Sequence, residues 1–440
     1  MPSRYCKYAF IEDGVENIYR YRLGGYHPIH IDDRLNDRYR IVDKLGHGAY
    51  STVWLAIDEQ TTNYVAIKVG TSDTDQVEVD ILTQIRQCPP RGNIWESNRL
   101  LIPPVLDHFE VTGPNGTHPC LVTPPARCNL RDLKEVVPDD LFQLDAARCL
   151  AAQLVIALSL IHDRGYAHGD LHLGNLLLQF PSPIDGLSVE QLHARYSELE
   201  KQPVLLLDTK APPTDPSVPS YAVSPMWFDI PEDGIALGEA MLTLSDFGVA
   251  FRPEDKSRFE SYTPLVLRPP EALSEAKTPL SFASDIWSLA CVIFELFADC
   301  SLFDGFKDQI TIQQVDIQGP MPPAWWEKCG VRQKWYEETG KPLRGSSKPY
   351  TWRQRFQDWV QDPRLERKWE TLAEDELDAL IELLRCMLAW SPSERLDISG
   401  VLRSDWMTRW ALPAYQKCLE LQKCLEVEKC LEVQKCSQDK

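Results

Sequence analysis

Hydrophobic and polar positions follow a strand-like period in the first quarter of this chain of 440 residues. Over 39–68 the sequence is rich in β-branched and aromatic residues, and a polar turn divides its second half. This pattern is typical of β-strands, and it predicts three antiparallel strands. Apolar residues at spacing four predict a short helix near 75–86. The run HPCLVTP over 118–124 predicts a further strand.

Helical periodicity dominates the rest of the chain. Apolar residues recur at spacings of three and four over 144–164, 283–297 and 377–388, which predicts three buried helices. A β-rich first quarter followed by a mostly helical remainder predicts an α+β fold with two lobes of different character. No apolar run comes close to the roughly 20 residues that a membrane span needs.

Three stretches differ from this pattern. We interpret residues 1–38, which are polar and aromatic, as an extended N-terminal arm. Residues 181–238 are rich in Pro, Ser and Asp, and they predict a long insert made partly of loop and partly of disordered chain. The tail over 413–440 repeats KCLE about every six residues, a period that keeps no single seam along a helix. We therefore predict a folded domain over 39–412, with the tail outside its core.

Charge and cysteine content narrow the possible partners. The net charge is −19, which disfavours direct binding to nucleic acids and favours basic partners.

The N-terminus MPSRYCKYAFIEDG lacks the apolar core of a signal peptide. The 13 cysteines show no CxxC pair, which favours a reduced compartment over a disulfide framework or a zinc site. We expect a soluble intracellular protein, in the cytoplasm, the nucleus or both, without membrane contact.

A glycine-rich turn between two predicted strands is the first candidate for chemistry. It runs from Leu45 to Val53 and contains Gly46 and Gly48. Because glycine has no Cβ, the backbone N–H groups of such a turn can approach a phosphate closely. The turn alone is a weak signal, since many hairpins contain two glycines.

A lysine on the next predicted strand strengthens this interpretation. Lys68 ends the apolar run Val-Ala-Ile-Lys, where its ammonium group can neutralise phosphate charge. Glu78, on the following predicted helix, is the best candidate to hold Lys68 in an ion pair. Asp75 and Asp80 are close enough in sequence to compete for that role.

Two polar loops in the second half of the chain carry the remaining candidates. In His168–Asn175, Asp170 is followed by Asn175 five residues later, between a predicted helix and a predicted strand. Asp170 can accept a proton from an attacking hydroxyl group. Asn175, and Asp246 in the later motif Ser-Asp-Phe-Gly, supply the hard oxygen ligands that Mg²⁺ prefers.

Two further motifs are predicted to be structural. Glu271 closes an Arg-Pro-Pro-Glu motif, and we expect it to pair with Arg395. Asp285 begins the predicted helix over 283–297, and its carboxylate can accept N–H groups from the loop that contains Asp170.

These motifs, in this order, resemble the eukaryotic protein kinase family over about residues 35–412. The resemblance implies a bilobal kinase domain with a β-rich N-lobe over about 39–124 and a larger helical C-lobe over about 127–412. It implies transfer of the γ-phosphate of ATP to a Ser or Thr hydroxyl group, with ATP and Mg²⁺ bound.

The resemblance also assigns roles to single residues. The implied catalytic residues are Asp170, Lys68, Asn175 and His172. The implied magnesium ligands are Asn175 and Asp246. The residues expected to contact or organise ATP are Leu45, Gly46, His47, Gly48, Ser51, Val53, Ala66, Lys68, Glu78 and Ala126.

Within the kinases, the chain resembles the SR-protein kinases, most closely their fungal members. It has Gly-Gly-Tyr-His-Pro over 24–28, Ser51 where most kinases have a third glycine, an insert where that family has its spacer, and a short segment over 248–268. The resemblance implies Arg-Ser-rich protein substrates, a role in mRNA splicing regulation, and activity without phosphorylation of that segment. We expect the chain to act as a monomer.

The chain departs from the usual kinase pattern at three places. Gly169 stands where most kinases have Arg, although SR-protein kinases also lack that residue. His172 replaces a lysine that contacts the γ-phosphate; because histidine is mostly neutral near pH 7, we expect turnover below the ~1–100 per second typical of kinases. Pro124 and Pro125 cannot donate the backbone hydrogen bond that often meets adenine, which leaves Ala126 as the donor.

Two other functions fit part of the sequence. Aminoglycoside and choline kinases use the form His-Gly-Asp-Leu-His-x-Gly-Asn, but they do not share the Arg-Pro-Pro-Glu motif and its partners as a set. A non-catalytic pseudokinase scaffold fits the departures, but Lys68, Asp170 and Asp246 are all present. Phosphate transfer to an Arg-Ser peptide, to a small alcohol, or to neither would separate these functions.

Overall fold

The chain folds into two compact units, each assembled from separate segments. The structure, a computed structural model, describes residues 7–9, 14–74, 76–87, 99–228, 234–273, 278–330, 332–337, 343 and 349–424. Unit 1 comprises Met1–Gln87, Pro103–Cys128 and Ser182–Asp229. Unit 2 comprises Cys88–Ile102, Asn129–Pro181 and Ile230–Lys440.

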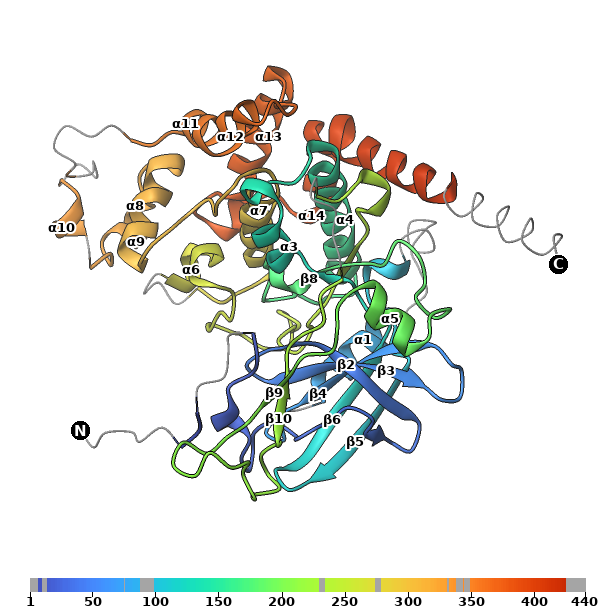
Figure 1. The fold of residues 1–440 in the computed structure, drawn as a ribbon. Helices are drawn as coiled ribbons and strands as arrows, with labels where there is room; N and C mark the ends of the chain where they lie inside the picture. The colour runs from blue at the N-terminus through green and yellow to red at the C-terminus, as the bar shows by residue number, and fades with distance from the viewer. Residues whose placement is uncertain are drawn as a thin grey trace. The chain divides into compact units, whose positions relative to one another are not determined.

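Unit 1 is built on a six-stranded antiparallel sheet with the strand order β1-β2-β3-β4-β6-β5 (Figure 1). Its strands are β1 (Arg34–Leu35), β2 (Tyr39–His47), β3 (Ser51–Asp58), β4 (Tyr64–Gly70), β5 (Asp107–Gly113) and β6 (Gly116–Thr123). The predicted strands correspond to β2, β3, β4 and β6, whereas β1 and β5 were not predicted. β5 is an edge strand whose residues are never fully buried, so its sequence carries only a weak apolar signal.

Helix α1 (Val77–Gln87) follows the first four strands and confirms the short helix predicted near 75–86. It buries Val79, Ile81, Leu82 and Ile85. These positions recur at spacings that place them on one helical face. Asp75 lies outside the described residues.

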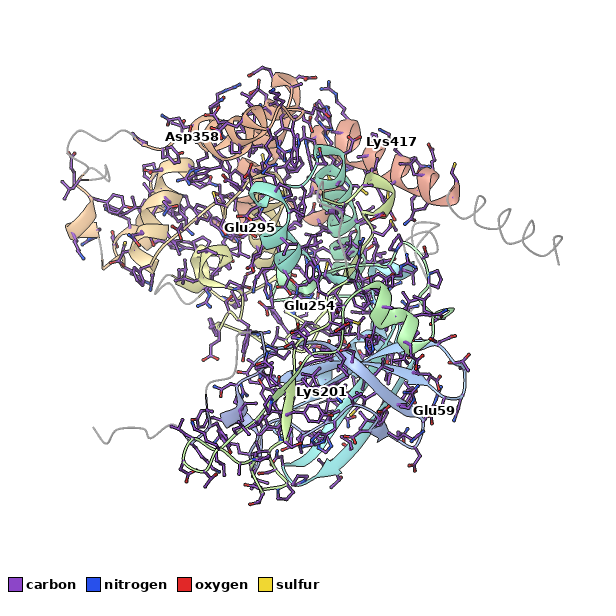
Figure 2. The ribbon with its side chains drawn as sticks, in the orientation of Figure 1. Glu59, Lys201, Glu254, Glu295, Asp358 and Lys417 are labelled. Atoms are coloured by element: carbon purple, nitrogen blue, oxygen red, sulfur yellow. The ribbon has the colours of Figure 1, made fainter. Side chains whose placement is uncertain are left out.

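The insert is part of unit 1 and contains α5 (Val189–Arg195) and the paired strands β9 (Lys201–Pro203) and β10 (Tyr221–Val223). Figure 2 shows Lys201 on β9. The Asp185 carboxylate accepts the Tyr64 N–H at 2.7 Å, and His193 Nε2 lies 2.9 Å from Asp43 Oδ2. Val223 is buried in the core of the main sheet. The prediction that this segment is partly disordered was therefore wrong for its described residues.

The N-terminal arm packs in the same unit. The arm residues Tyr8, Ile18, Tyr21 and Tyr26 form a buried cluster with three insert residues. These insert residues are Val204, Val218 and Ala222. Glu16 of the arm also forms an ion pair with Lys44 of β2, and the side chains are 1% and 0% exposed. Residues 14–38 are thus part of the folded unit, which begins before the predicted boundary at residue 39.

Unit 2 is mostly helical. Its helices are α3 (Leu130–Val136), α4 (Leu144–His162), α6 (Pro270–Leu273), α7 (Phe282–Phe297), α8 (Lys307–Gln318), α9 (Pro323–Trp326), α10 (Arg332–Trp335), α11 (Trp352–Phe356), α12 (Asp362–Glu366), α13 (Glu374–Met387) and α14 (Ile398–Leu402). Its two antiparallel strands are β8 (Leu176–Leu178) and β11 (Leu242–Leu244), and β7 (Cys128–Asn129) lies at the chain boundary between the units. The helices predicted over 144–164, 283–297 and 377–388 correspond to α4, α7 and α13.

Short 3₁₀ and π turns connect these elements. They are η1 (Ile18–Arg20), η2 (Arg99–Leu101), η3 (Pro138–Asp140), η4 (Leu173–Asn175), η5 (Leu237–Glu239), η6 (Leu265–Leu267), η7 (Gln357–Gln361), η8 (Pro392–Glu394) and η9 (Met407–Ala411). The most important for function is η4, because it lies inside the loop that contains Asp170.

Helix α4 is an exception to the prediction that no apolar run is long enough to span a membrane. It has 19 residues and is long and apolar enough, by length and composition, to cross a membrane. However, 89% of its most apolar window is buried inside the protein. The helix therefore has the burial of a core helix, and its apolar character is explained by packing in unit 2.

The C-terminal tail is folded in its first part. Residues 412–424 are helical, and Tyr415 and Cys418 are buried. Lys417, labelled in Figure 2, places its Nζ 3.1 Å from Asp145 Oδ2 of α4. The predicted boundary at residue 412 was therefore wrong by about three helical turns, and residues 425–440 lie outside the described part of the chain.

Candidate active site

The lysine predicted to contact phosphates is held by an acidic partner in unit 1. Lys68 Nζ on β4 donates to Glu78 Oε2 on α1 at 2.6 Å. Both side chains are partly buried, with exposures of 27% and 14%, so solvent screens the pair less than a surface pair. Asp80 is exposed. The predicted Lys68–Glu78 ion pair is confirmed.

The glycine-rich turn joins β2 to β3. Its Gly48 N–H donates to the Ser51 carbonyl oxygen at 2.8 Å. A Cβ built on Gly46 or Gly48 would meet no protein atom within 4 Å. Packing within the protein therefore does not require glycine at these positions. The open space suits close approach of a phosphate to the backbone.

The remaining predicted ATP residues of unit 1 lie on neighbouring elements. Ala66 of β4 is buried, whereas Leu45 and Val53 are partly buried. The Ala126 N–H donates no hydrogen bond to any residue in the described part of the chain. It follows two prolines, so it is the first backbone donor after Thr123.

In unit 2, a buried aspartate organises the loop that contains Asp170. Asp285, at the start of α7, accepts the N–H of His168 at 2.7 Å and that of Gly169 at 2.9 Å. His162 Nε2 of α4 lies 2.9 Å from the same carboxylate. Only 3% of Asp285 is exposed. The predicted role of Asp285 as an acceptor of backbone N–H groups is confirmed.

Asp170 and Asn175 belong to one hydrogen-bonded loop. The Asn175 side-chain amide donates to the Asp170 carbonyl oxygen at 2.9 Å. The Asn175 carbonyl oxygen accepts the N–H of Ser245 at 2.9 Å and its hydroxyl at 3.0 Å. Ser245 directly precedes Asp246, so these bonds join the two polar loops. Asp170 Oδ1 is buried and has no hydrogen-bond partner among the described residues.

Asp246 has an unusual backbone conformation. Its φ is 61°, in the left-handed region that non-glycine residues rarely adopt. Phe247 beside it is fully buried, and its ring packs edge-on against His168 at 5.1 Å. Such strain persists only where the surroundings enforce it, and it concentrates at functional sites.

Asn175 and Asp246 have the chemistry that Mg²⁺ requires. The amide nitrogen of Asn175 is engaged by the Asp170 carbonyl, which leaves its side-chain oxygen as a ligand. A carboxylate and an amide oxygen are hard ligands that suit Mg²⁺. No cluster of three or more His, Cys, Asp or Glu side chains suitable for a metal occurs in the described ranges. Asn175 and Asp246 therefore supply two ligands of the kind that Mg²⁺ accepts.

The segment after Asp246 is held by its own arginine. The Arg258 guanidinium donates to the Val249 carbonyl and packs over the rings of Phe251 and Tyr262, at 4.9 and 4.6 Å. Burial lowers the pKa of Arg258. A Cβ on Gly169, whose φ is 78°, would come within 3.4 Å of Phe251, of the Val249 carbonyl and of Arg258. A side chain at this position would therefore crowd these groups and adopt a strained backbone conformation.

The predicted structural pair lies deeper in unit 2. Arg395 Nη2 and Glu271 Oε2 are 2.6 Å apart, and both side chains are 0% exposed. Ser284 also donates to Glu271 at 2.8 Å. These bonds satisfy a buried charge pair that would otherwise be costly.

His172, the unusual residue after Asp170, has a partner that the sequence did not predict. Arg131 of α3 places its Nη2 3.0 Å from His172 Nδ1. The two residues are 41 positions apart, and no motif connects them. The sequence analysis did not identify Arg131 as part of this site.

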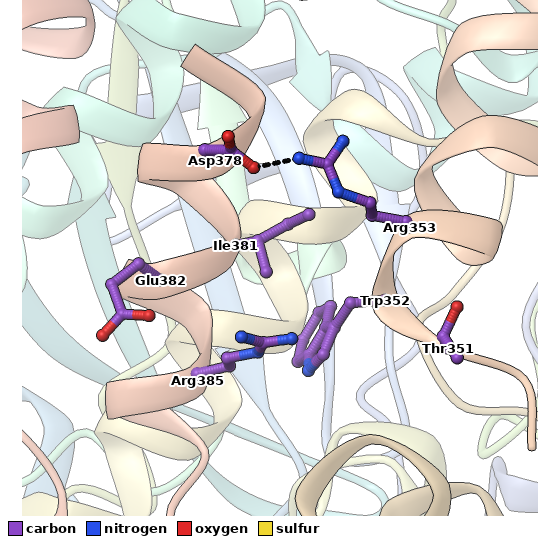
Figure 3. Close-up of a pocket in the computed structure, with 7 residues that line it drawn as sticks. All are labelled: Thr351, Trp352, Arg353, Asp378, Ile381, Glu382 and Arg385. Carbon is purple, nitrogen blue, oxygen red and sulfur yellow. Dashed lines mark hydrogen bonds and ion pairs between the residues drawn. The ribbon is translucent and has the colours of Figure 1, made fainter. Parts of the chain in front are cut away.

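A separate pocket of about 450 Å³ lies between α11 and α13 (Figure 3). Figure 3 shows Arg353 and Asp378 joined by an ion pair at its rim. Its lining residues are Thr351, Trp352, Arg353, Asp378, Ile381, Glu382 and Arg385. None of them belongs to the predicted catalytic or ATP-binding residues.

Comparison with known proteins decides the family. The protein kinase domain matches residues 39–184 and 226–407, more than half of the chain. The chain belongs to the protein kinase family. The stretch between the two matched ranges falls within the insert, as expected for a segment added to the kinase domain.

Two relatives indicate which type of protein kinase the chain resembles. The serine/threonine-protein kinase SRPK of Physarum polycephalum is 26% identical over 430 residues, which span 90% of this chain and 91% of that protein. SRSF protein kinase 3 of Homo sapiens is 32% identical over 166 residues, which span 36% of this chain and 28% of that protein. The chain is a serine/threonine protein kinase of the SRPK type.

A solved kinase domain shows the shared fold. It has a TM-score of 0.58 and 17% sequence identity, and the similarity covers 87% of this chain and 98% of that one. The predicted α+β kinase fold, with a sheet-rich N-terminal part and a helical C-terminal part, is confirmed. The small-molecule phosphotransferase is not favoured by these relatives.

Proposed function

We propose that this kinase transfers the γ-phosphate of ATP to Ser in basic proteins rich in Arg-Ser repeats. Two facts support this substrate class. The chain carries a net charge of −19 and has a pI near 5.0, which favours basic partners. A human relative is named SRSF protein kinase 3. We further propose that the chain acts as a monomer in the cytoplasm, the nucleus or both, and regulates mRNA splicing.

The reaction assigns one task to each residue. Asp170 accepts the proton of the Ser hydroxyl as its oxygen attacks the γ-phosphorus. The new O–P bond forms while the bond between the γ-phosphorus and the β-phosphate bridging oxygen breaks, and ADP leaves. Lys68, oriented by Glu78, contacts the α- and β-phosphates. Asn175 and Asp246 would hold Mg²⁺, which would neutralise charge on the phosphates.

One observation favours an active enzyme over a pseudokinase. Asn175 holds the Asp170 backbone at 2.9 Å, and Ser245 joins Asn175 to the segment of Asp246. All three chemical residues of unit 2 are thus present in one hydrogen-bonded arrangement. A scaffold without catalysis has no need for that preorganisation.

A radiolabelled ATP assay tests the proposal. Purified protein with Mg²⁺ would be given an Arg-Ser repeat peptide, the same peptide with every Ser changed to Ala, and an acidic Ser peptide. We expect transfer to the Arg-Ser peptide alone. Asp170→Ala should abolish transfer while ATP still binds, and Asp378→Asn, at the separate pocket, should leave the rate unchanged.

Each other outcome has a definite meaning. Equal transfer to both Ser peptides would retain the kinase and contradict the Arg-Ser preference. Wild-type turnover in the Asp170→Ala variant would contradict the assigned base. ATP binding without transfer to any peptide would favour the pseudokinase scaffold.

A further inference from the structure

His172 is held by two hydrogen-bond donors at the same ring nitrogen. Its Nδ1 lies 3.0 Å from the backbone N of Gly174 and 3.0 Å from Nη2 of Arg131. A backbone N–H and a guanidinium N–H can only donate, so Nδ1 must be an acceptor without a hydrogen. The hydrogen of the neutral ring is therefore on Nε2.

The protonated nitrogen is directed toward the reacting residues. His172 Nε2 lies 3.7 Å from Asp170 Oδ2, beyond the range of a hydrogen bond. No other described residue accepts a hydrogen bond from this nitrogen. The Nε2–H thus remains able to donate to a group that approaches Asp170.

Arg131 reaches His172 from a well-anchored position. It is the second residue of α3, whose N-cap is Asn129, and the Asn129 side chain accepts the N–H groups of Arg131 and Asp132 at 3.0 Å each. The Arg131 side chain itself is exposed. A Cβ on Gly174 would come within 3.4 Å of the Arg131 guanidinium carbon, so the guanidinium packs closely on the loop.

Two acidic residues, Asp170 and Glu295, interact electrostatically with this pair. Asp170 lies beside the His172 ring, and Glu295 of α7, labelled in Figure 2, is buried nearby. Burial raises the pKa of Glu295, while the positive charges of Lys134 and Arg131 are among the influences that oppose this rise. The charge of Arg131 therefore acts on the groups around this loop, including Glu295.

We propose that Arg131 and His172 together replace the single lysine that most kinases place two residues after the catalytic aspartate. His172 donates its Nε2–H to the transferring phosphoryl group. Arg131 is a positioning residue: it fixes the tautomer and orientation of His172, and its guanidinium adds the positive charge that a neutral imidazole lacks. This inference rests on the proposed function, because it concerns the same phosphoryl transfer.

A set of variants tests the inference. It comprises Arg131→Met, Arg131→Lys, His172→Lys, the double variant Arg131→Met/His172→Lys, and Arg409→Met. Arg409→Met is the control. It removes one exposed positive charge of unit 2, the Arg409 guanidinium, which pairs with Asp375 and Asp405. For each variant, kcat, the KM for ATP, the KM for peptide and the melting temperature would be measured.

If Arg131 fixes the tautomer of His172, the variants should show a specific kinetic pattern. We expect Arg131→Met to lower kcat about 10- to 100-fold with little change in the KM for ATP. Arg131→Lys should lie between wild type and Arg131→Met. In the His172→Lys background, loss of Arg131 should reduce kcat by no more than about 3-fold, because lysine needs no partner to fix its donor. Arg409→Met should behave as wild type.

Two kinetic results would overturn the inference. One is an Arg131→Met variant with wild-type kcat. The other is an equal loss of kcat on removal of Arg131 in the wild-type and His172→Lys backgrounds, since a purely structural role would act in both. A fall in melting temperature that accompanies the kinetic loss in both backgrounds would indicate the same structural role.

A spectroscopic measurement keeps this test separate from the proposed function. In protein labelled with ¹⁵N-histidine, the signal that disappears in His172→Lys belongs to His172. We expect that signal to show the Nε2–H tautomer in wild type and a mixture of tautomers in Arg131→Met. An unchanged signal in Arg131→Met would contradict the pairing. This result is obtained even if no peptide is phosphorylated, an outcome that would contradict the proposed function alone.

Discussion

Tyr26 donates its hydroxyl hydrogen to the carbonyl oxygen of Gly48 at a distance of 2.6 Å. The bond joins the N-terminal arm to the tip of the glycine-rich turn. Two neighbouring contacts reinforce it: Arg20 stacks over Tyr50 at 5.7 Å, and His47 Nε2 lies 3.2 Å from the Gly14 carbonyl. The arm therefore restrains the segment expected to cover the phosphates of ATP.

Removing that hydroxyl group should weaken nucleotide binding. Tyr26→Phe keeps the buried ring but loses a hydrogen bond worth about 0.5–1.5 kcal/mol. We expect the KM for ATP to rise about 2- to 10-fold with a smaller change in kcat. Tyr19→Phe, in the same arm, serves as the control, because the Tyr19 hydroxyl meets the backbone of Lys7 instead of the turn. An unchanged KM for ATP would show that the arm does not restrain the turn.

The buried pair of Glu271 and Arg395 should govern the stability of unit 2. Arg395→Met leaves the Glu271 carboxylate buried without its partner, which typically costs about 3–5 kcal/mol. We expect a large fall in the free energy of unfolding in a denaturant titration. Arg353→Met removes an exposed ion pair with Asp378 and should cost less than about 1 kcal/mol. Similar losses in both variants would contradict the importance of burial.

His27, which packs beside His118 in unit 1, should make the stability of the protein depend on pH. Burial, together with the neighbouring His118, lowers the pKa of His27 to about 4. Because the unfolded chain binds a proton near pH 6.5, the folded state is favoured above that pH and loses stability as the pH falls from about 6.5 toward 4.

Thermal melts at several pH values would test this dependence. Between pH 7 and pH 5 we expect wild type to lose about 1–2 kcal/mol more than His27→Phe, which keeps a ring against His118 but does not titrate. His108→Phe, at an exposed position of β5, should follow the wild-type curve. A His27→Phe curve parallel to wild type would place the pH dependence elsewhere.

The folded part of the C-terminal tail should contribute to stability. A chain that ends at Leu412 loses the buried side chains of Tyr415 and Cys418 and the contact of Lys417 with Asp145. We expect a loss of about 2–4 kcal/mol for that chain. A chain that ends at Cys424 keeps helix 412–424 and serves as the reference. If both chains unfold alike, helix 412–424 adds nothing to the core.

Much of the active site was predictable because its chemistry depends on short motifs. The Lys68–Glu78 pair, the Asp285 hydrogen bonds to the loop of Asp170, and the Glu271–Arg395 pair all connect residues whose local motifs are specific. Their catalytic roles remain predictions. Arg131 was not predictable, because a lone arginine on a helix is usually a solvated side chain and only the tertiary structure brings it to His172.

The insert and the tail were misjudged for a different reason. Val204, Val218 and Ala222 are isolated apolar residues in polar sequence, so no periodic pattern reveals them. They are buried because the arm supplies Tyr8 and Ile18 on the other side of the cluster. In the tail, the six-residue repeat concealed the fact that its first copy, over 417–422, continues a helix with a buried face.

Unit 1 takes its final segment from Ser182–Asp229, more than 50 residues after its preceding segment ends at Cys128. A ribosome must therefore deliver about half of the chain before the main sheet can acquire its insert and the arm can complete its buried cluster. Until then, Ile18, Tyr21 and Tyr26 lack the apolar partners that the insert supplies. At about 5–20 residues per second, this delay lasts roughly ten seconds or more. The nascent chain thus exposes the aromatic side chains of the arm during translation, and exposed apolar surface of this kind promotes aggregation until the insert covers it.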